Sequence, residues 1–203
     1  MKKINMLLTV ICLCFITSTG FAMRYTISNA NFSIEVPNSF RVITDTSTIT
    51  EDECKDFHMT RTEILNMMHS GIVYLYGIDN DSHMMIQGMR TEDSFFVQVG
   101  DLRNVDKETL DQIKNQLIRS VFESKGVQTN EITEYTNADA KYVVAEGIIS
   151  TPDMKGEKAV ARMFVTVTHG RMYMYSITYG YAEQLTPQQR KACQNIIDSV
   201  EYY

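Results

Sequence analysis

The 203-residue chain has no tryptophan, three prolines and four cysteines. The prolines stand singly, and no Pro/Gly/Ser-rich linker, low-complexity tract or internal repeat divides the sequence. It contains no run of basic residues, which binding to nucleic acid or anionic lipid would require. It also lacks a glycine-rich phosphate loop, which argues against a nucleotide-binding doubly wound fold.

One apolar run, residues 6–16, lies near the start of the chain and follows Lys2 and Lys3. A run of this length is too short to cross a hydrocarbon core of ~30 Å as a helix. A short apolar run behind a positive start is typical of a secretory signal peptide. An uncleaved membrane anchor is the less favoured alternative.

Gly20 and Ala22 provide small residues at positions −3 and −1 of a cleavage before Met23. We therefore predict a signal peptide over residues 1–22 and a secreted or extracytoplasmic protein. The remaining 181 residues, 23–203, have 17 basic and 25 acidic side chains and a formal charge of −8. This length suits a single domain. No later apolar stretch reaches membrane-spanning length either, so we expect no stable membrane insertion after cleavage.

Cys12 and Cys14 fall inside the predicted signal peptide. A lipoprotein is a further alternative, but each of these cysteines follows a large residue where lipidation needs a small one. Cys54 and Cys193 remain after cleavage, and an oxidising compartment permits a disulfide between them. The other interpretation is two buried free thiols, because both cysteines lie on apolar faces of predicted helices.

Alternating apolar residues and turn signals predict a strand-rich first half. Capping boxes at Thr50 and Thr60 indicate two short helices between the strands. The expected strands cover 24–28, 31–36, 40–44, 72–78, 83–90 and 95–99, and the expected helices cover 51–57 and 61–69.

The second half contains the clearest amphipathic helix, over 106–124. A meander of four strands follows, over 130–135, 141–150, 159–168 and 172–181, with a two-residue turn at His169-Gly170. Thr186-Pro187 then starts a final helix. Strands that are mostly adjacent in sequence predict an α+β fold, with helices packed on an antiparallel meander.

The segment Asn31–Phe40, a strand followed by a proline turn and an aromatic residue, resembles the opening of PsbP-like and DcrB-like proteins. The later order of a long helix, a meander and a final helix ending in Ile196–Val200 is also similar. Phe40 stands where these families usually have tryptophan. The resemblance implies a single PsbP-like domain over residues 23–203. It also implies a non-enzymatic accessory or envelope protein, since the family has no shared catalytic residues.

Methionines beside histidines form one possible metal motif, in Met67-Met68-His69 and His83-Met84-Met85. Thioether and imidazole groups are ligands that suit Cu(I). Methionine is also a common core filler, and we prefer that interpretation. The histidines show no metalloprotease spacing, and no nucleophile elbow accompanies the serines. We therefore expect no cofactor, no metal and no enzymatic activity.

Tyrosines are the most suggestive feature of the last meander strand. Tyr173, Tyr175, Tyr179 and Tyr181 occupy alternate positions and share one face of it. Such a face is either covered by a helix of the same protein or exposed as a groove for a ligand or partner. We take these four tyrosines as candidate binding residues.

These features favour an exported, non-enzymatic protein that binds a protein partner in the cell envelope and carries an exposed aromatic patch. The alternative is a carrier or sensor of a small apolar ligand, bound between the sheet and a helix.

Overall fold

The structure is a computed structural model. It describes residues 22–44, 47–56, 59–71, 73–79, 82–89, 98–117, 127–149, 158–180 and 182–203. The predicted signal peptide lies outside the described residues except for Ala22, the first residue of strand β1. Its cleavage therefore stays a prediction.

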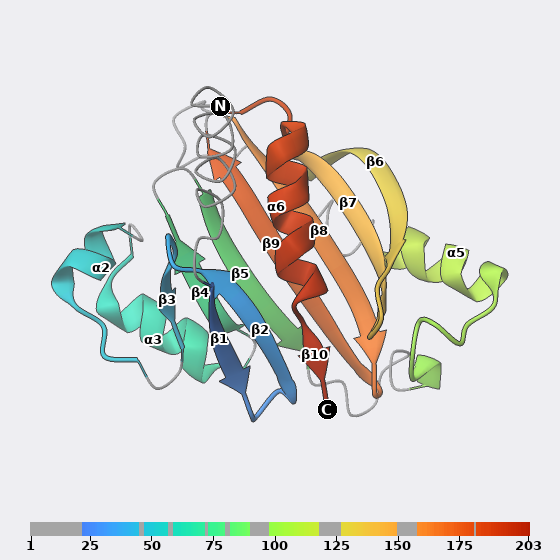
Figure 1. The fold of residues 1–203 in the computed structure, drawn as a ribbon, viewed down its shortest axis with the longest axis horizontal. Helices are drawn as coiled ribbons and strands as arrows, with labels where there is room; N and C mark the ends of the chain where they lie inside the picture. Colours follow the sequence, from blue (N-terminus) through green and yellow to red (C-terminus); the bar gives the residue numbers. More distant parts are fainter. Residues whose placement is uncertain are drawn as a thin grey trace, which may run out of the picture.

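A seven-stranded antiparallel sheet forms the centre of the molecule (Figure 1), with the strand order β3-β4-β5-β9-β8-β7-β6. The predicted meander is confirmed, because β6, β7, β8 and β9 are neighbours in this order. The strands are β3 (Arg41–Ile43), β4 (Val73–Ile78), β5 (Ser82–Met89), β6 (Val127–Thr136), β7 (Lys141–Ile149), β8 (Ala159–Thr168) and β9 (Arg171–Gly180).

A second sheet of three strands has the order β1-β2-β10 and lies over one face of the first. Its strands are β1 (Ala22–Ile27), β2 (Phe32–Pro37) and β10 (Glu201–Tyr202). The sequence did not predict β10, which has two residues and pairs antiparallel with β2 near the start of the chain. A strand this short has too few residues to show an alternating pattern.

Four helices are described: α2 (Glu51–Asp56), α3 (Arg61–His69), α5 (Lys107–Leu117) and α6 (Pro187–Asp198). The capping boxes before α2 and α3 are confirmed. The Thr60 hydroxyl accepts from Glu63 N, and Thr60 N donates to the Glu63 carboxylate at 2.7 Å. Thr186 and Gln189 form the same arrangement at the start of α6.

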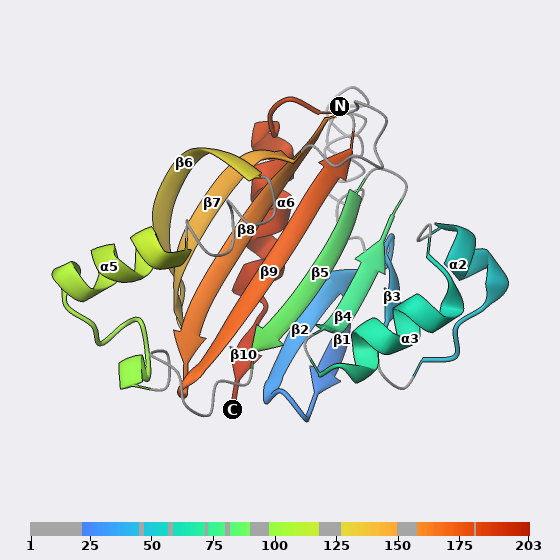
Figure 2. The same ribbon diagram turned by 180° about the vertical axis from the view of Figure 1, so that it is seen from behind.

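The covering elements are divided between the two faces of the large sheet. In Figure 1, α6 and the small sheet lie in front of it, and Figure 2, from behind, shows α2, α3 and α5 on the other side. Alternation along β5 agrees with this, because Met84 packs in the core beneath α6 while Met85 packs against the cluster beneath α3. The central strands of the large sheet are therefore covered on both faces, whereas Thr133 and Glu134 of the edge strand β6 are exposed.

Two local predictions had opposite outcomes. His169 and Gly170 form the expected two-residue turn, both with positive φ, of 49° and 70°. The strand predicted over 95–99 is wrong where it is described, because Gln98 and Val99 are helical. Residues 95–97, and 118–124 of the predicted long helix, lie outside the described residues.

The observed architecture confirms the predicted α+β class and the antiparallel sheet with packed helices. Among the helices of the described ranges, none combines the length and apolar character needed to cross a membrane.

Candidate functional site

The tyrosine-bearing face of β9 lies in the core between the large sheet, α6 and the small sheet. Tyr173 and Tyr175 point toward β2, and their ring centroids are 5.8 Å and 6.4 Å from that of Phe32. Both contacts are edge-to-face, the geometry that the charge distribution of aromatic rings favours. Tyr179 belongs to the same core cluster.

The hydroxyl groups of these tyrosines bond to other parts of the chain. Tyr173 donates to the carbonyl of Ala30 at 2.5 Å. The Tyr175 hydroxyl lies 2.6 Å from that of Tyr202 on β10, and the Tyr202 hydroxyl lies 3.4 Å from that of Tyr142. A buried phenol without a partner would cost ~1–3 kcal/mol, so these bonds make burial of the tyrosines tolerable.

The expected exposed aromatic patch is wrong for the three predicted residues that the structure describes. Tyr173, Tyr175 and Tyr179 are 3%, 0% and 9% exposed, because α6 and the small sheet cover them. Tyr181 lies outside the described residues. Burial also raises the pKa of Tyr175 well above its ordinary value, so this phenol stays protonated. The face contributes to the core and is not accessible to a partner.

The space between α6 and the sheet is occupied by the protein's own side chains. Cys193 and Ile197 of α6 are fully buried there, as are Phe164 and Ile177 of the sheet. This is where the alternative hypothesis placed a small apolar ligand. Side chains of the described residues therefore already occupy the space where a small apolar ligand was expected to bind.

The two cysteines are free thiols and do not form the disulfide that the sequence allowed. Cys193 belongs to α6 and packs in the core between α6 and the large sheet. Cys54 belongs to α2 and packs against the cluster beneath α3, on the other face of the sheet. The large sheet separates these clusters, so the two sulfur atoms cannot meet without rearrangement of the fold. Burial raises the pKa of the Cys193 thiol to about 11, which makes it a poor nucleophile.

A charged cluster that the sequence analysis missed lies beside the first turns of α6. Glu146 on β7 faces Arg162 on β8 across the sheet, at 2.8 Å between Oε2 and a guanidinium nitrogen. Arg190 of α6 contacts the other oxygen, Oε1, at 2.6 Å. The side chains of Glu146 and Arg162 are 12% and 18% exposed, so water screens this pair weakly.

Hydrogen bonds from Arg190 and Arg162 hold the pKa of Glu146 below its ordinary range, against the opposing effect of burial. Arg162 also lies over the ring of Phe164, 5.5 Å from its centroid. Its Nε atom is buried without a hydrogen-bond partner among the described residues. The sequence carried one signal for this cluster, a single charged residue inside each of two apolar strands.

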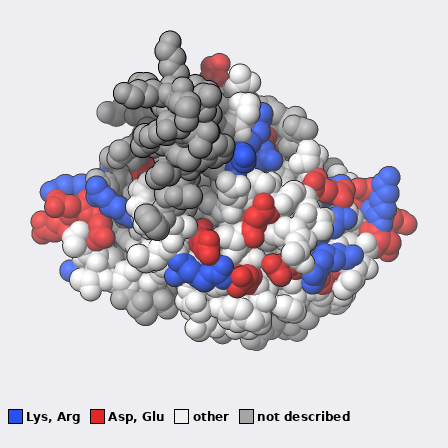
Figure 3. Space-filling view, viewed as in Figure 1, with Lys and Arg blue, Asp and Glu red and all other residues white. Residues whose placement is uncertain are grey.

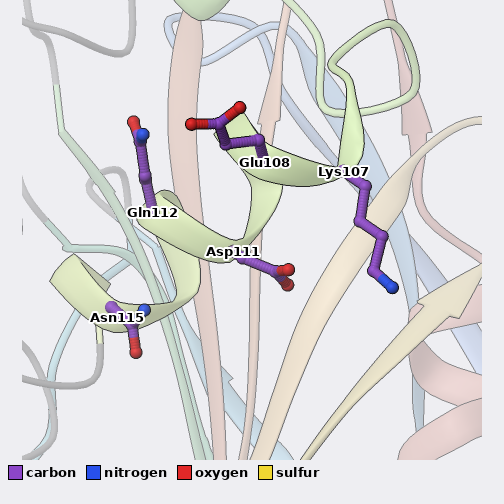
Figure 4. A pocket seen from close by; sticks show the side chains of 5 residues that line it. All are labelled: Lys107, Glu108, Asp111, Gln112 and Asn115. Carbon is purple, nitrogen blue, oxygen red and sulfur yellow. The ribbon is translucent and has the colours of Figure 1, made fainter.

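An open cavity of about 540 Å³ lies against the outer side of α5 (Figure 4). Its lining is polar, which is unlike the apolar cavity that a carrier of small apolar ligands would need. On the face shown in Figure 3, basic and acidic side chains are interspersed outside the grey region. Within the described ranges, no group of three or more His, Cys, Asp or Glu side chains could hold a metal. The cavity is lined by Lys107, Glu108, Asp111, Gln112 and Asn115.

These features define an α+β domain, and one solved structure has a similar fold. The fold is similar to that of cyanobacterial PsbP (CyanoP) from Synechocystis sp. PCC 6803. The TM-score is 0.53, with 11% sequence identity, over 93% of this chain and 96% of that chain. At this identity the likeness shows the fold alone. The PsbP-like fold predicted from the sequence is therefore confirmed.

Two further structures are similar at lower scores. LpqN, involved in cell envelope biogenesis of Mycobacterium tuberculosis, gives a TM-score of 0.42 with 8% identity over 89% of each chain. The Ran-binding protein Mog1p of Saccharomyces cerevisiae gives 0.42 with 8% identity, over 90% of this chain and 95% of that chain. No protein-family model and no curated protein sequence matches the chain.

The burial of Tyr175 on β9 predicts that it is modified more slowly than an exposed tyrosine. Tetranitromethane should nitrate Tyr203, which is 55% exposed, well before Tyr175, which is fully buried. Peptide mapping by mass spectrometry checks this order, and the difference should disappear in urea. Equal nitration of both residues in the native protein would contradict the described packing.

The charged cluster predicts a pH-dependent stability effect. Glu146→Gln leaves Arg162 without its charged partner and should lower the free energy of unfolding by about 2–3 kcal/mol at pH 7. Because folding lowers the pKa of Glu146, its contribution is fully present above the unfolded value and is lost as the pH falls. The difference from wild type should therefore shrink below about pH 4.3, the ordinary pKa of a glutamate.

Urea denaturation at pH 7 and at pH 3.5 measures this difference. Glu183→Gln is the matched control, because Glu183 pairs with Lys158 at 3.3 Å but is 79% exposed. It should change stability by less than about 1 kcal/mol at either pH. A Glu146→Gln loss that is the same at both pH values would show that its charge is not responsible.

Proposed function

We propose that this protein is exported and acts, without catalysing a reaction, as an accessory module that binds a partner protein in the cell envelope or extracellular space. The PsbP-like fold carries the proposal, because the resemblance to PsbP-like and DcrB-like proteins implies an accessory or envelope role. The likeness to CyanoP covers 93% of the chain, so this support concerns nearly the whole domain.

The amino-terminal sequence supports export. Cleavage before Met23 would remove one residue from β1 and keep five of its six pairs with β2. The processed chain would thus keep almost all of the small sheet. The small-x-small pattern at Gly20 and Ala22 is the pattern that a signal peptidase recognises.

A partner would have to contact the outside of the molecule, since the tyrosines of β9 are buried. The polar side of α5 and the exposed side of α6 are two accessible regions on opposite faces of the sheet. The alternative of a small apolar ligand has less support. Its expected position between α6 and the sheet is filled by Cys193, Ile197 and their neighbours.

Export predicts a defined processing site. When the full chain is produced in a bacterial host with a signal peptidase, the exported protein should begin at Met23. Ala22→Asp should block cleavage, because the −1 position admits small residues alone, while Thr19→Ser should be processed normally. N-terminal sequencing and intact mass check this. A cytoplasmic, unprocessed wild-type chain would refute export.

Partner binding predicts crosslinking confined to one face of the protein. A photo-crosslinking amino acid at Gln112 on α5 tests one face, and one at Gln188 on α6 tests the other. The experiment uses intact cells of the producing organism, with mass spectrometry of the crosslinked species. We expect one position to yield a discrete heterologous adduct and the other to yield much less.

Two results would count against this proposal. Equal labelling of many proteins from both positions would indicate random encounter, and no adduct from either would argue against a partner at these surfaces. Export has a separate readout, so it can hold or fail independently of partner binding.

A further inference from the structure

The tyrosine near the end of β6 is half-buried, and its hydroxyl is bonded to a carboxylate. Tyr135 donates to Oδ1 of Asp198, the last residue of α6, at 2.5 Å. Bonds of ~2.5–2.7 Å from O–H groups to charged oxygens are roughly twice as strong as bonds between neutral groups. The two residues are 63 positions apart in the sequence, so the fold brings the phenol and the carboxylate together.

Three elements fix this pair in position. The ring of Tyr135 stacks on that of Tyr142, directly opposite on β7, with centroids 6.2 Å apart and an interplanar angle of 26°. Asn137, just after β6, donates from its side-chain amide to the carbonyl of Ile197 at 3.2 Å. This bond ties the end of α6 to the end of β6, so Asp198 is held beside the phenol.

The hydroxyls of the core tyrosines bond to neutral groups instead. Tyr173 donates to the carbonyl of Ala30 at 2.5 Å, and the hydroxyls of Tyr175 and Tyr202 lie 2.6 Å apart. A peptide carbonyl and a neutral phenol are far weaker proton acceptors than a carboxylate. A positive charge left on one of these buried phenols would also be costly in apolar surroundings.

This difference matters for the loss of an electron. A tyrosine phenol keeps its proton at neutral pH, because its ordinary pKa is about 10. Removal of an electron makes that proton strongly acidic, so oxidation is easiest where a base already contacts the hydroxyl. Tyr135 has such a base in Asp198, and Asp198 is exposed, so the transferred proton can exchange with water.

We propose that Tyr135 is a redox-active tyrosine and that Asp198 is its proton acceptor. The substrates are one-electron oxidants, such as the radicals formed from peroxides. The oxidant takes one electron from the phenol, and the O–H proton passes to the carboxylate. The products are a neutral phenoxyl radical, a carboxylic acid and the reduced oxidant. A one-electron reductant reverses the step, with the proton returning from Asp198, and the site is independent of the function proposed above.

The test oxidises the purified protein with photogenerated tris(bipyridine)ruthenium(III), a one-electron oxidant, in the presence of the spin trap 2-methyl-2-nitrosopropane. Peptide mapping by mass spectrometry then locates the tyrosines that carry the trap. Tyr135 should carry more trap than Tyr203, although Tyr135 is half-buried and Tyr203 is 55% exposed. The fully buried Tyr175 should carry none.

Two substitutions of Asp198 test its role as the proton acceptor. Asp198→Asn keeps the size of the side chain but removes the base. The ratio of trap at Tyr135 to trap at Tyr203 should fall by at least roughly tenfold, since a positioned base accelerates proton transfer by ~10²–10⁴-fold. Asp198→Glu retains a carboxylate and should keep more of this ratio than Asp198→Asn does.

The matched control is Asp139→Asn, in the turn between β6 and β7. Asp139 contacts Asn137 through its backbone N–H at 3.0 Å, so this variant should leave the ratio unchanged. Thermal melts show whether each variant is folded. The proposal is overturned if Tyr203 carries most of the trap in the wild type. An unchanged ratio in Asp198→Asn, or an equal loss in Asp139→Asn, also overturns it.

Discussion

The central strands of the large sheet have no face in contact with water, and this burial on both sides determines much of the remaining structure. All but one residue of β8 is buried, and so are seven of the ten residues of β9. Most polar groups on these strands therefore need a hydrogen-bond partner inside the protein, and Nε of Arg162 is an exception. The bonds from Tyr173 to Ala30 and from Arg162 to Glu146 both meet this requirement.

The small sheet supplies hydrogen-bond partners for the buried tyrosines of the large sheet. Tyr202 reaches the hydroxyls of Tyr142 and Tyr175, while Glu201 on the same short strand binds Arg24 of β1 at 2.5 Å. The chain's last strand thus connects the edge of the small sheet with the middle of the large one. A two-residue strand gains this role from its side chains more than from its backbone pairing.

Local patterns predicted much of the fold. Capping boxes at Thr50 and Thr60, and the turn at His169-Gly170, are set by neighbouring residues and were confirmed. Features that depend on distant segments were missed, because a local pattern carries no information about which segment packs against it. Alternation placed the β9 tyrosines on one face, but what covers a face depends on segments such as β10, more than twenty residues away. The separation of Cys54 from Cys193 likewise depends on which face each helix covers.

The position of β2 between the first and last strands has a consequence for when the domain folds. Ser33 and Glu201 lie 168 positions apart and meet across β2 and β10. A chain made from its amino terminus cannot complete this sheet until Tyr202 has been synthesised. Closing so long a loop is slow, and β2 has no strand on its second edge in the meantime. The small sheet is therefore the last part of the domain that can be completed, because it needs residues from both ends of the described chain.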